Sequence, residues 1–445
     1  MLFRSDELKN AFSGFIKRQS PARIIAFGFA AVILIGSGIL MLPCSVREGV
    51  ALRYIDALYT STSAVCVTGL IAADAGDTFT AFGQTVLAAL IQIGGLGVTA
   101  IGAGVILATG RRMNLKERTV VREALNFDSG SGVVRLLRSI FLTTVVIELA
   151  GAALSYPVFA RDHTPLHAVG ISLFHSIAAF NNAGFDILGG GTNLIPYRDS
   201  ITLNLVSAML TVLGGIGFLV IREVLSKRFR RRRFSMHTHV VLSMSAVLLA
   251  AGTLLLKLTE GDNISWLGAF FFSASARTSG FSTYPLSGFS NAGLIVLNVL
   301  MFIGASPGST GGGIKTSTFF ALLQGIRSAA TNKSEKAFRY SVPKSAFRKA
   351  AVITAIGISV VLTGTFFMAL MEPDIPLRDI VTEVVSAFAT VGLSTGITPG
   401  LSVGSKLLSV LIMYIGRLGP MTIVTLWYFS RGERVSYPEG NLVIG

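Results

Sequence analysis

The stretch that decides the fold reads Thr62-Ser63-Ala64-Val65-Cys66-Val67-Thr68-Gly69-Leu70. Its residues are small, hydroxyl-bearing or apolar, and it ends in glycine followed by leucine. Apolar segments flank it on both sides, and each is long enough to cross a bilayer. Glycine followed by Leu or Phe recurs in three further segments, at residues 180–185, 276–281 and 388–393. We therefore interpret the stretch as the first of four copies.

The spacing of the copies indicates an internal repeat. Their glycines, Gly69, Gly184, Gly280 and Gly392, are 115, 96 and 112 residues apart. A second cluster of small residues follows each glycine, at residues 93–97, 213–217, 303–308 and 415–419. We expect each cluster mid-way along an apolar helix, where glycine permits close backbone approach or a break in the helix. Two features at matched offsets together predict a fourfold repeat.

The bulk composition is typical of a membrane protein. Of the 445 residues, 51% are hydrophobic and 14% are charged, whereas about a quarter of the residues of a soluble domain are charged. In a soluble protein the net charge of +15 would suggest a nucleic-acid partner. An unequal distribution of basic residues across a bilayer explains it here, so we expect no nucleic acid. We predict an all-α polytopic membrane protein of four helix–pore-loop–helix repeats, with eight transmembrane helices and four re-entrant pore helices around one central pore.

The predicted boundaries follow from the apolar runs. The eight expected spans lie near residues 24–42, 82–109, 137–160, 201–221, 239–257, 292–325, 350–371 and 406–429. The expected units are an N-terminal segment at 1–23, repeats at 24–110, 134–225, 237–329 and 346–430, and a tail at 431–445. Most of the 38 Lys and Arg residues fall in the two termini and the loops between repeats, which the positive-inside rule assigns to the cytoplasm. We therefore expect a multi-pass protein of the cell membrane whose termini are both cytoplasmic.

The glycine stretches have the properties of a cation filter. Non-helical backbone at membrane depth is tolerated only where protein encloses it or water lines it. Glycine leaves no side chain in the path, and rings of carbonyl oxygens can replace the hydration shell of a cation. The segments before the glycines can form half-helices whose negative ends point at the ion. The predicted filter consists of Val67, Thr68, Gly69, Asn182, Ala183, Gly184, Thr278, Ser279, Gly280, Thr390, Val391 and Gly392.

The same residues allow other interpretations. The glycines could be ordinary turn and packing residues, and the repeats could enclose the solute or cation site of a secondary transporter. All four units start on the same side of the membrane, which favours a pore over inverted repeats. Residues 308–316 resemble a phosphate-binding loop, but Ile314 separates the last glycine from Lys315 and no strand precedes them. The filter segments carry no ring of Asp or Glu, and the chain has no CxxC motif. We therefore predict no enzyme, no metal site and no covalently bound cofactor.

The chain resembles the Ktr/Trk/HKT superfamily of potassium transporters over essentially its whole length. The resemblance rests on the four helix–pore–helix units with one filter glycine each, and on Val67-Thr68-Gly69, which is similar to the filter pattern of potassium channels. Eight spans without a further N-terminal pair look most like the bacterial Ktr membrane subunit. In some plant relatives the first filter glycine is serine, and sodium then competes. Gly69 therefore implies uptake of potassium, with sodium as the second candidate ion.

The resemblance also implies a gate in the third repeat. Residues 304–316 interrupt an expected span with five glycines and a proline, so a continuous helix is not expected there. In the family this break is an intramembrane loop below the filter, and an arginine matching Arg417 lies near it. We hypothesise that Lys315 and Arg417 form an electrostatic barrier; alternatively they snorkel or bind carbonyls of the loop. The predicted gate residues are Gly304, Ser306, Pro307, Gly308, Gly311, Gly312, Gly313, Lys315 and Arg417.

The family further implies partners that the residues themselves do not identify. These are a second copy in a membrane homodimer and a cytosolic nucleotide-binding ring, together with sodium dependence and a role in osmotic stress. Two buried charges have separate expectations. We expect Arg277 behind the filter, bonded to carbonyls or to a carboxylate such as Glu383, and we expect Glu148 to form a contact between helices.

Overall fold

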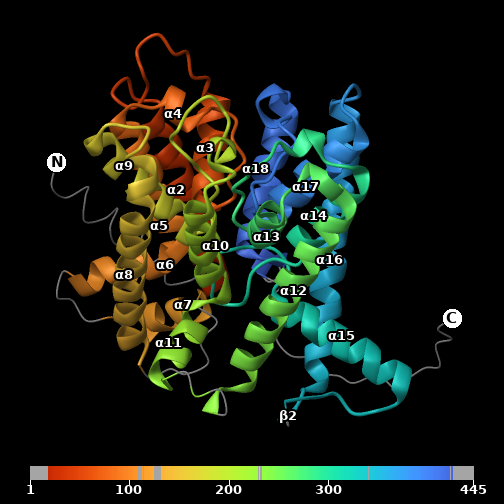
Figure 1. Cartoon of the computed structure of the whole chain (residues 1–445). Helices are drawn as coiled ribbons and strands as arrows, with labels where there is room; N and C mark the ends of the chain where they lie inside the picture. The colour runs from red at the N-terminus through yellow and green to blue at the C-terminus, as the bar shows by residue number, and fades with distance from the viewer. Residues whose placement is uncertain are drawn as a thin grey trace.

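The computed structural model describes residues 19–108, 113, 115–124, 132–228, 230, 233–338, 340–420, 422 and 423. The predicted N-terminal segment up to residue 18 and the tail at 431–445 lie outside the described residues. The elements are helices apart from one hairpin, β1 (Lys336–Ala337) with β2 (Tyr340–Ser341), in the part of the chain that is described. The prediction of an all-α chain is confirmed (Figure 1).

One order of elements, a long helix, a shorter helix, a glycine stretch and another helix, occurs at four places. The long helices are α2 (Pro21–Leu40), α8 (Val133–Phe159), α12 (Met236–Glu260) and α16 (Lys344–Met371). The shorter helices are α3 (Tyr54–Val65), α9 (Pro165–Phe180), α13 (Trp266–Ser275) and α17 (Leu377–Ala389). The helices after the glycine stretches are α5 (Ala81–Leu96), α10 (Ile201–Ile216), α14 (Asn291–Phe302) and α18 (Val403–Leu418).

Smaller elements connect these twelve helices. They are α4 (Ala75–Thr78), α6 (Val98–Ala108), α7 (Leu115–Ala124), η1 (Ile195–Tyr197), α11 (Phe218–Ser226), η3 (Gly261–Asn263), η4 (Leu286–Gly288), α15 (Thr316–Thr331) and η5 (Thr398–Gly400).

The helices after the glycine stretches begin in the same way. Each has Ser or Thr at its N-cap, and the side-chain oxygen accepts a hydrogen bond from the backbone N–H three residues on. The four caps are Thr80, Ser200, Ser290 and Ser402. Because a cap satisfies one of the donors left unpaired at a helix start, these residues explain why each helix begins where it does.

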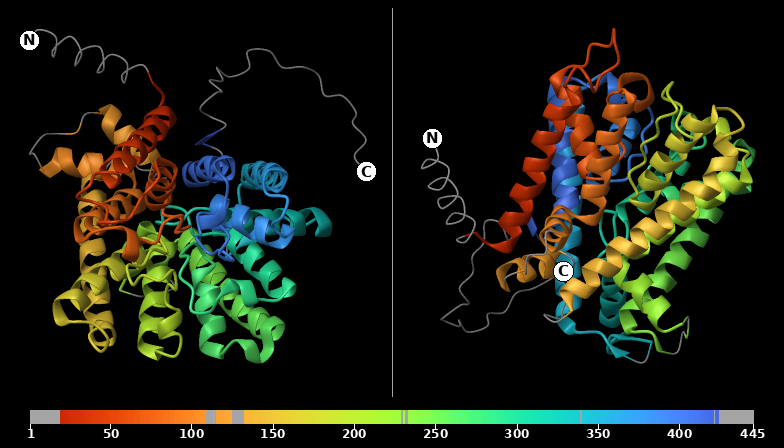
Figure 2. Two further views of the ribbon diagram at one scale, coloured as in Figure 1. Left: turned by 90° about the horizontal axis from the view of Figure 1, so that it is seen from above. Right: turned by 90° about the vertical axis from the view of Figure 1, so that its left-hand side faces the viewer.

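The packing of the helices closes into a ring. Helix α5 contacts α9, α10 contacts α13, α14 contacts α17, and α18 returns to contact α3. Each helix that follows a glycine stretch therefore packs against the shorter helix of the next unit, and the last unit meets the first. Seen from above, the four colour groups of the chain surround a common centre in sequence order (Figure 2).

The long apolar helices agree with a membrane protein. Three helices among the described residues are long and apolar enough to span a bilayer, and five are if each of two bent pairs counts as one span. The predicted number of eight spans stays a prediction. Helix α8, one of the remaining expected spans, carries Arg135, Arg138 and Glu148, and the end expected for the last span lies outside the described residues.

Three expected spans are not continuous helices. The segments predicted at 82–109 and 201–221 bend by 98° and 96° between α5 and α6 and between α10 and α11. The bends fall at Gly97 and Gly217, whose φ angles of +90° and +92° are reached easily by glycine alone. The third cluster breaks its span completely, because α14 ends at Phe302 and α15 begins at Thr316.

A buried ion pair joins the last unit to the first. The Lys406 ammonium group of α18 donates to the Asp56 carboxylate of α3 over 2.8 Å, and the lysine side chain is 1% exposed. Lys406 also donates to the carbonyl oxygen of Pro399. A buried charge needs such partners, since desolvation of an unpaired ion is costly. No motif in the sequence pointed to this pair, whose members lie 350 residues apart.

Replacing this lysine should destabilise the protein. We expect Lys406→Met to cost about 3 kcal/mol, because Asp56 keeps its charge in a buried place with only the exposed Arg53 left as partner. The melting temperature of the purified protein in detergent measures the loss. The double variant Lys406→Met with Asp56→Asn should regain most of it. Arg198→Met, which breaks the exposed pair with Asp199, should cost less than about 1 kcal/mol. Equal losses for both lysine and arginine variants would contradict the role of the buried pair.

Candidate functional site

The four glycine stretches follow the C-terminal ends of α3, α9, α13 and α17, as predicted. Each key glycine has a positive φ angle, between +66° at Gly184 and +95° at Gly392. The residue two positions earlier also has a positive φ, although none of these is glycine. These residues are Val67, Asn182, Thr278 and Thr390, with φ angles of +57°, +59°, +76° and +51°. A β-branched residue in this conformation is a genuine outlier, and strain of this kind gathers at functional sites.

The four stretches meet one another in a closed cycle. A methyl group built on Gly69 would lie under 3.0 Å from the carbonyl oxygen of Ala183, and a methyl group built on Gly184 would lie under 3.0 Å from the carbonyl oxygen of Ser279. The cycle continues from Gly280 to the carbonyl of Val391, and closes from Gly392 to the carbonyl of Thr68. Side chains essentially never approach so closely, so each of the four positions has room for glycine only. The structure thus brings the predicted filter residues of all four units together.

Local hydrogen bonds fix this backbone. In the first and fourth units the glycine N–H donates to a serine hydroxyl six residues earlier, Ser63 for Gly69 and Ser386 for Gly392, at 3.0 and 2.9 Å. In the second unit the Asn193 amide donates to the carbonyl oxygen of Gly184 over 3.1 Å. Because buried backbone groups need partners, these side chains allow non-helical backbone to persist inside the protein.

The second set of glycines supports the first. Methyl groups built on Gly94, Gly214 and Gly416 would lie under 3.0 Å from the carbonyl oxygens of Val65, Phe180 and Phe388. Each of these carbonyls belongs to the residue four positions before a key glycine. The two sequence signals that predicted the repeat are therefore in direct contact, and the small residues let α5, α10 and α18 press against the ends of α3, α9 and α17.

The predicted gate loop lies directly against the filter stretches. Methyl groups built on Gly311 and Gly312 would lie under 3.0 Å from the hydroxyl oxygens of Thr278 and Thr390. Its first half is tied to the second unit, because the Ser306 and Thr310 N–H groups donate to the carbonyls of Gly215 and Gly214 at 2.9 and 3.3 Å. Its ends pair with each other at Ile303 and Ile314.

The two basic residues of the predicted gate bind loop carbonyls. The Lys315 ammonium group donates to the carbonyl oxygens of Gly311 and Gly312 at 2.6 and 3.3 Å. The Arg417 guanidinium donates to the carbonyls of Thr310 and Gly94, and so joins the loop to α5. Both residues line a cavity of about 180 Å³ beside the loop. The alternative of carbonyl binding is thus present in the structure, and the electrostatic barrier stays a prediction.

The pairing suggested between Arg277 and Glu383 is wrong. Arg277 is buried behind the filter and donates to the backbone oxygen and hydroxyl of Ser245 at 3.3 and 3.1 Å. Glu383 instead accepts from the hydroxyls of Ser394 and Thr398, at 2.7 and 2.6 Å. These short-range hydroxyl donors, 11 and 15 residues after Glu383, satisfy its carboxylate without a cation.

The expectation for Glu148 is confirmed. Its carboxylate accepts from the side-chain amides of Gln92 and Asn181, at 3.4 and 2.9 Å, and so joins α8 to α5 and to the end of α9. Asn181 directly precedes the predicted filter residue Asn182. Sequence reasoning missed Gln92 and Asn181, since a polar amide in an apolar run carries no partner information by itself.

Chemically, the site offers four backbone carbonyl oxygens, each lying against the glycine of a neighbouring stretch, and no carboxylate among the twelve predicted filter residues. The C-terminal ends of α3, α9, α13 and α17 precede it, and helix C-termini carry partial negative charge. Such an arrangement is suited to a dehydrated monovalent cation, which oxygen dipoles can coordinate without a fixed counter-charge.

Comparisons with known proteins agree with this geometry. The family described as "TrkH: Cation transport protein" matches residues 18–431. The chain is 37% identical to the Ktr system potassium uptake protein B of Bacillus subtilis, over 96% of this chain and 97% of that protein. It is 36% identical to the potassium/sodium uptake protein NtpJ of Enterococcus hirae, over 96% and 98% of the two chains. The crystal structure of the potassium transporter TrkH from Vibrio parahaemolyticus has a similar fold, with a TM-score of 0.73 at 17% identity, covering 93% of this chain and 86% of that one.

The contact between the two glycine sets gives a prediction about stability. Gly214→Ala should destabilise the protein by about 1–3 kcal/mol, because its methyl group meets the carbonyl oxygen of Phe180. Gly170→Ala, in α9 of the same unit, has nothing within 4 Å of its new methyl group and should be neutral or stabilising by up to about 1 kcal/mol. Melting temperatures in detergent compare the two. A Gly214 variant as stable as the Gly170 variant would contradict the close packing.

Proposed function

The chain belongs to the TrkH family of cation transport proteins, and we propose that it is the membrane-embedded, ion-translocating subunit of a potassium uptake system. The observation that carries this proposal is the closed cycle of four glycines, each next to a carbonyl oxygen of the following stretch. The Bacillus relative is named as a potassium uptake protein and the Enterococcus relative as a potassium/sodium uptake protein, which supports potassium as the main ion and sodium as the second candidate.

In this proposal the ion passes a filter formed by the backbone of the twelve residues named above. The four units keep the boundaries predicted from the sequence and cross the cell membrane eight times, with both termini in the cytoplasm. The basic inter-repeat loops support this orientation. The low fixed charge of the filter supports conduction, because an ion must be bound strongly enough to enter and weakly enough to leave.

The loop of residues 304–316 is the proposed gate. Its contacts with Thr278 and Thr390 support a position in the ion path just below the filter. Lys315 and Arg417 hold the loop through its carbonyls, and their positive charge adds a barrier to cations in the closed state. Displacement of residues 311–315 would remove the backbone of that part of the loop and the Lys315 charge together, while Arg417 stays on α18.

Regulation in this proposal comes from partners. We assign to the protein a second copy in the membrane, sodium-dependent activity, and control by a cytosolic nucleotide-binding ring during osmotic stress. The basic residues of the proposed cytoplasmic face support an acidic or anionic partner there. The name "Ktr system" of the Bacillus relative, which implies more than one component, supports a partner protein as well.

Selectivity tests the filter directly. The purified chain in liposomes should take up rubidium, a potassium substitute, in preference to sodium, with and without the cytosolic partner. Gly69→Ser should lower this preference about tenfold or more, a change of about 1.4 kcal/mol, because the new side chain meets the Ala183 carbonyl and displaces it. Gly49→Ser is the matched control, since Gly49 has a similar φ of +82° but nothing within 4 Å. Unchanged ion preference in Gly69→Ser would contradict the filter, and absence of uptake by the unmodified chain would contradict the function.

The gate has its own test. Lys315→Ala removes two hydrogen bonds to the loop and one positive charge, so we expect faster rubidium uptake through an unchanged filter. Lys349→Ala, an exposed lysine near the start of α16, controls for the loss of charge. Uptake rates and ion preference are measured in the same liposomes. Equal rates in the Lys315 variant, the Lys349 variant and the unmodified chain would argue against the gate.

A further inference from the structure

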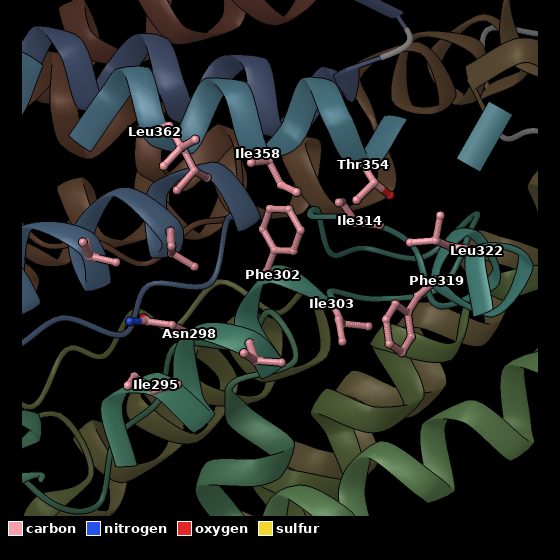
Figure 3. A pocket seen from close by; sticks show the side chains of 14 residues that line it. Ile295, Asn298, Phe302, Ile303, Ile314, Phe319, Leu322, Thr354, Ile358 and Leu362 are labelled. Carbon is pink, nitrogen blue, oxygen red and sulfur yellow. The ribbon is translucent and has the colours of Figure 1, made fainter. Parts of the chain in front are cut away.

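A cavity of about 430 Å³ lies between α14, α15, α16 and α17, beside the broken span of the third unit. Figure 3 shows Phe302 pointing from the end of α14 to Ile358 of α16, with Ile303, Ile314 and Phe319 grouped near it. Its volume is in the range of pockets that bind small molecules, about 300–1,000 Å³. The cavity is separate from the proposed ion path, whose loop forms one of its walls.

The lining of this cavity is apolar. Twelve of its fourteen lining residues are aliphatic or aromatic, and the exceptions are Asn298 and Thr354. The Asn298 side chain donates to the Thr382 hydroxyl over 3.3 Å. Its carbonyl oxygen and the Thr354 hydroxyl have no hydrogen-bond partner within the described part of the chain. Figure 3 places Asn298 and Thr354 well apart, so no cluster of polar partners holds ordered water, and the cavity favours an apolar occupant.

Exposed aliphatic side chains rim the mouth of the cavity. Ile295 and Val299 on α14 are 64% and 54% exposed, and Leu362 on α16 is 65% exposed. Exposed aliphatic side chains on a membrane-spanning helix contact lipid hydrocarbon, and Phe366 and Leu370 continue this surface along α16. The cavity therefore opens along an exposed apolar face of α16, a helix that is long and apolar enough to span a bilayer.

The size of the cavity discriminates between a lipid chain and a protein helix. A helix with its side chains is about 10 Å across and rises about 5.4 Å per turn, so a single turn fills a volume on the order of 400 Å³. A helix of a second copy could thus place no more than about one turn inside the cavity. An acyl chain is thinner and flexible, and it can enter from the side while its headgroup stays at the interface.

We propose that this cavity binds one acyl chain of a membrane phospholipid, and that the bound chain supports the two ends of the loop. The wall next to the loop consists of Phe302, Ile303 and Ile314. Here the Ile314 N–H donates to the Phe302 carbonyl over 3.2 Å, which pairs the strand-like ends of the loop. An occupant packed on these side chains fills a void and so stabilises the pairing.

The same wall reaches the filter through one aromatic contact. The Phe302 ring stacks on Phe388, with centroids 5.9 Å apart, and Phe388 lies two residues before Thr390 of the predicted filter. An acyl chain packed on Phe302 thus contacts a side chain that itself packs against the end of α17 at Phe388. Only the consequence for gating rests on the proposed function. The binding of the acyl chain and its effect on the amides of the loop do not.

Photolabelling tests the binding. The full chain is placed in nanodiscs of phosphatidylcholine whose acyl chain carries a diazirine, and labelled residues are mapped by mass spectrometry. We expect labels on lining residues such as Phe302 and Val361. Val361→Trp fills the cavity and should reduce this labelling about tenfold, the effect of losing contact with about two methylene groups. Leu370→Trp, on the lipid-facing surface of α16 outside the cavity, should leave it unchanged.

Other outcomes would overturn the proposal. Labels confined to surface residues such as Leu370 would mean that lipid surrounds the helix without entering the cavity. Cross-links from the lining of one chain to a second chain would mean that a protein partner fills it. These results come from the unmodified chain, so they hold even where Val361→Trp does not fold.

Hydrogen exchange tests the support of the loop. Amides of residues 303–316 should exchange more slowly in phospholipid nanodiscs than in lipid-stripped detergent, while those of the hairpin β1–β2 should not change. Equal exchange of the loop in both conditions would overturn the second half of the proposal. Because neither measurement uses transport, their failure and a failure of the proposed potassium uptake can be told apart.

Discussion

Backbone meets backbone at the centre of this protein, and the remaining structure depends on that contact. Each key glycine lies against a carbonyl oxygen of the next stretch, so that a β-carbon at any of the four would collide with it. Close approach of this kind requires that the helices behind it also come close. Gly94, Gly214 and Gly416 provide this by lying against the carbonyls of Val65, Phe180 and Phe388. The glycines are therefore not independent features but two layers of one packing arrangement.

Irregular backbone at membrane depth also needs polar partners, and the protein supplies them from side chains behind the stretches. Ser63 and Ser386 accept from glycine amides, while Asn193 donates to the Gly184 carbonyl and accepts from Leu194 and Ser282. Since water is absent from the hydrocarbon region, each such bond is worth more than its modest net value in water suggests. The first and fourth units use the same partner, a serine six residues before the glycine, whereas the second unit uses Asn193. Different side chains can therefore support the same backbone shape.

The sequence predicted what depends on local residue type. Glycine spacing identified the residues that meet at the centre, and the run of glycines with Pro307 identified the broken span, which the structure has between Phe302 and Thr316. The bends at Gly97 and Gly217 were less predictable, because a glycine within an apolar run fits a close contact and a break equally well. Long-range polar pairs could not be predicted. Lys406 and Asp56 lie 350 residues apart. Of the two kinds of partner expected for Arg277, the structure has a carbonyl, that of Ser245, whereas nearby hydroxyls satisfy Glu383.

The hydrogen bonds divide the loop into a part that is bound to the second unit and a part that is bound mainly within the third unit. Residues 306–310 are bound to the second unit, because Ser306 and Thr310 donate to α10 and the Gly308 carbonyl accepts from Phe218. The carbonyls of Gly311 and Gly312 accept from Lys315 of the same loop, so displacing 311–315 together leaves these bonds intact. It is also this part that touches Thr278 and Thr390. For the proposed gate, the displacement that breaks the fewest of these bonds pivots on residues 306–310 and breaks the pairing of Ile314 with Phe302, while Arg417 stays bound to Thr310.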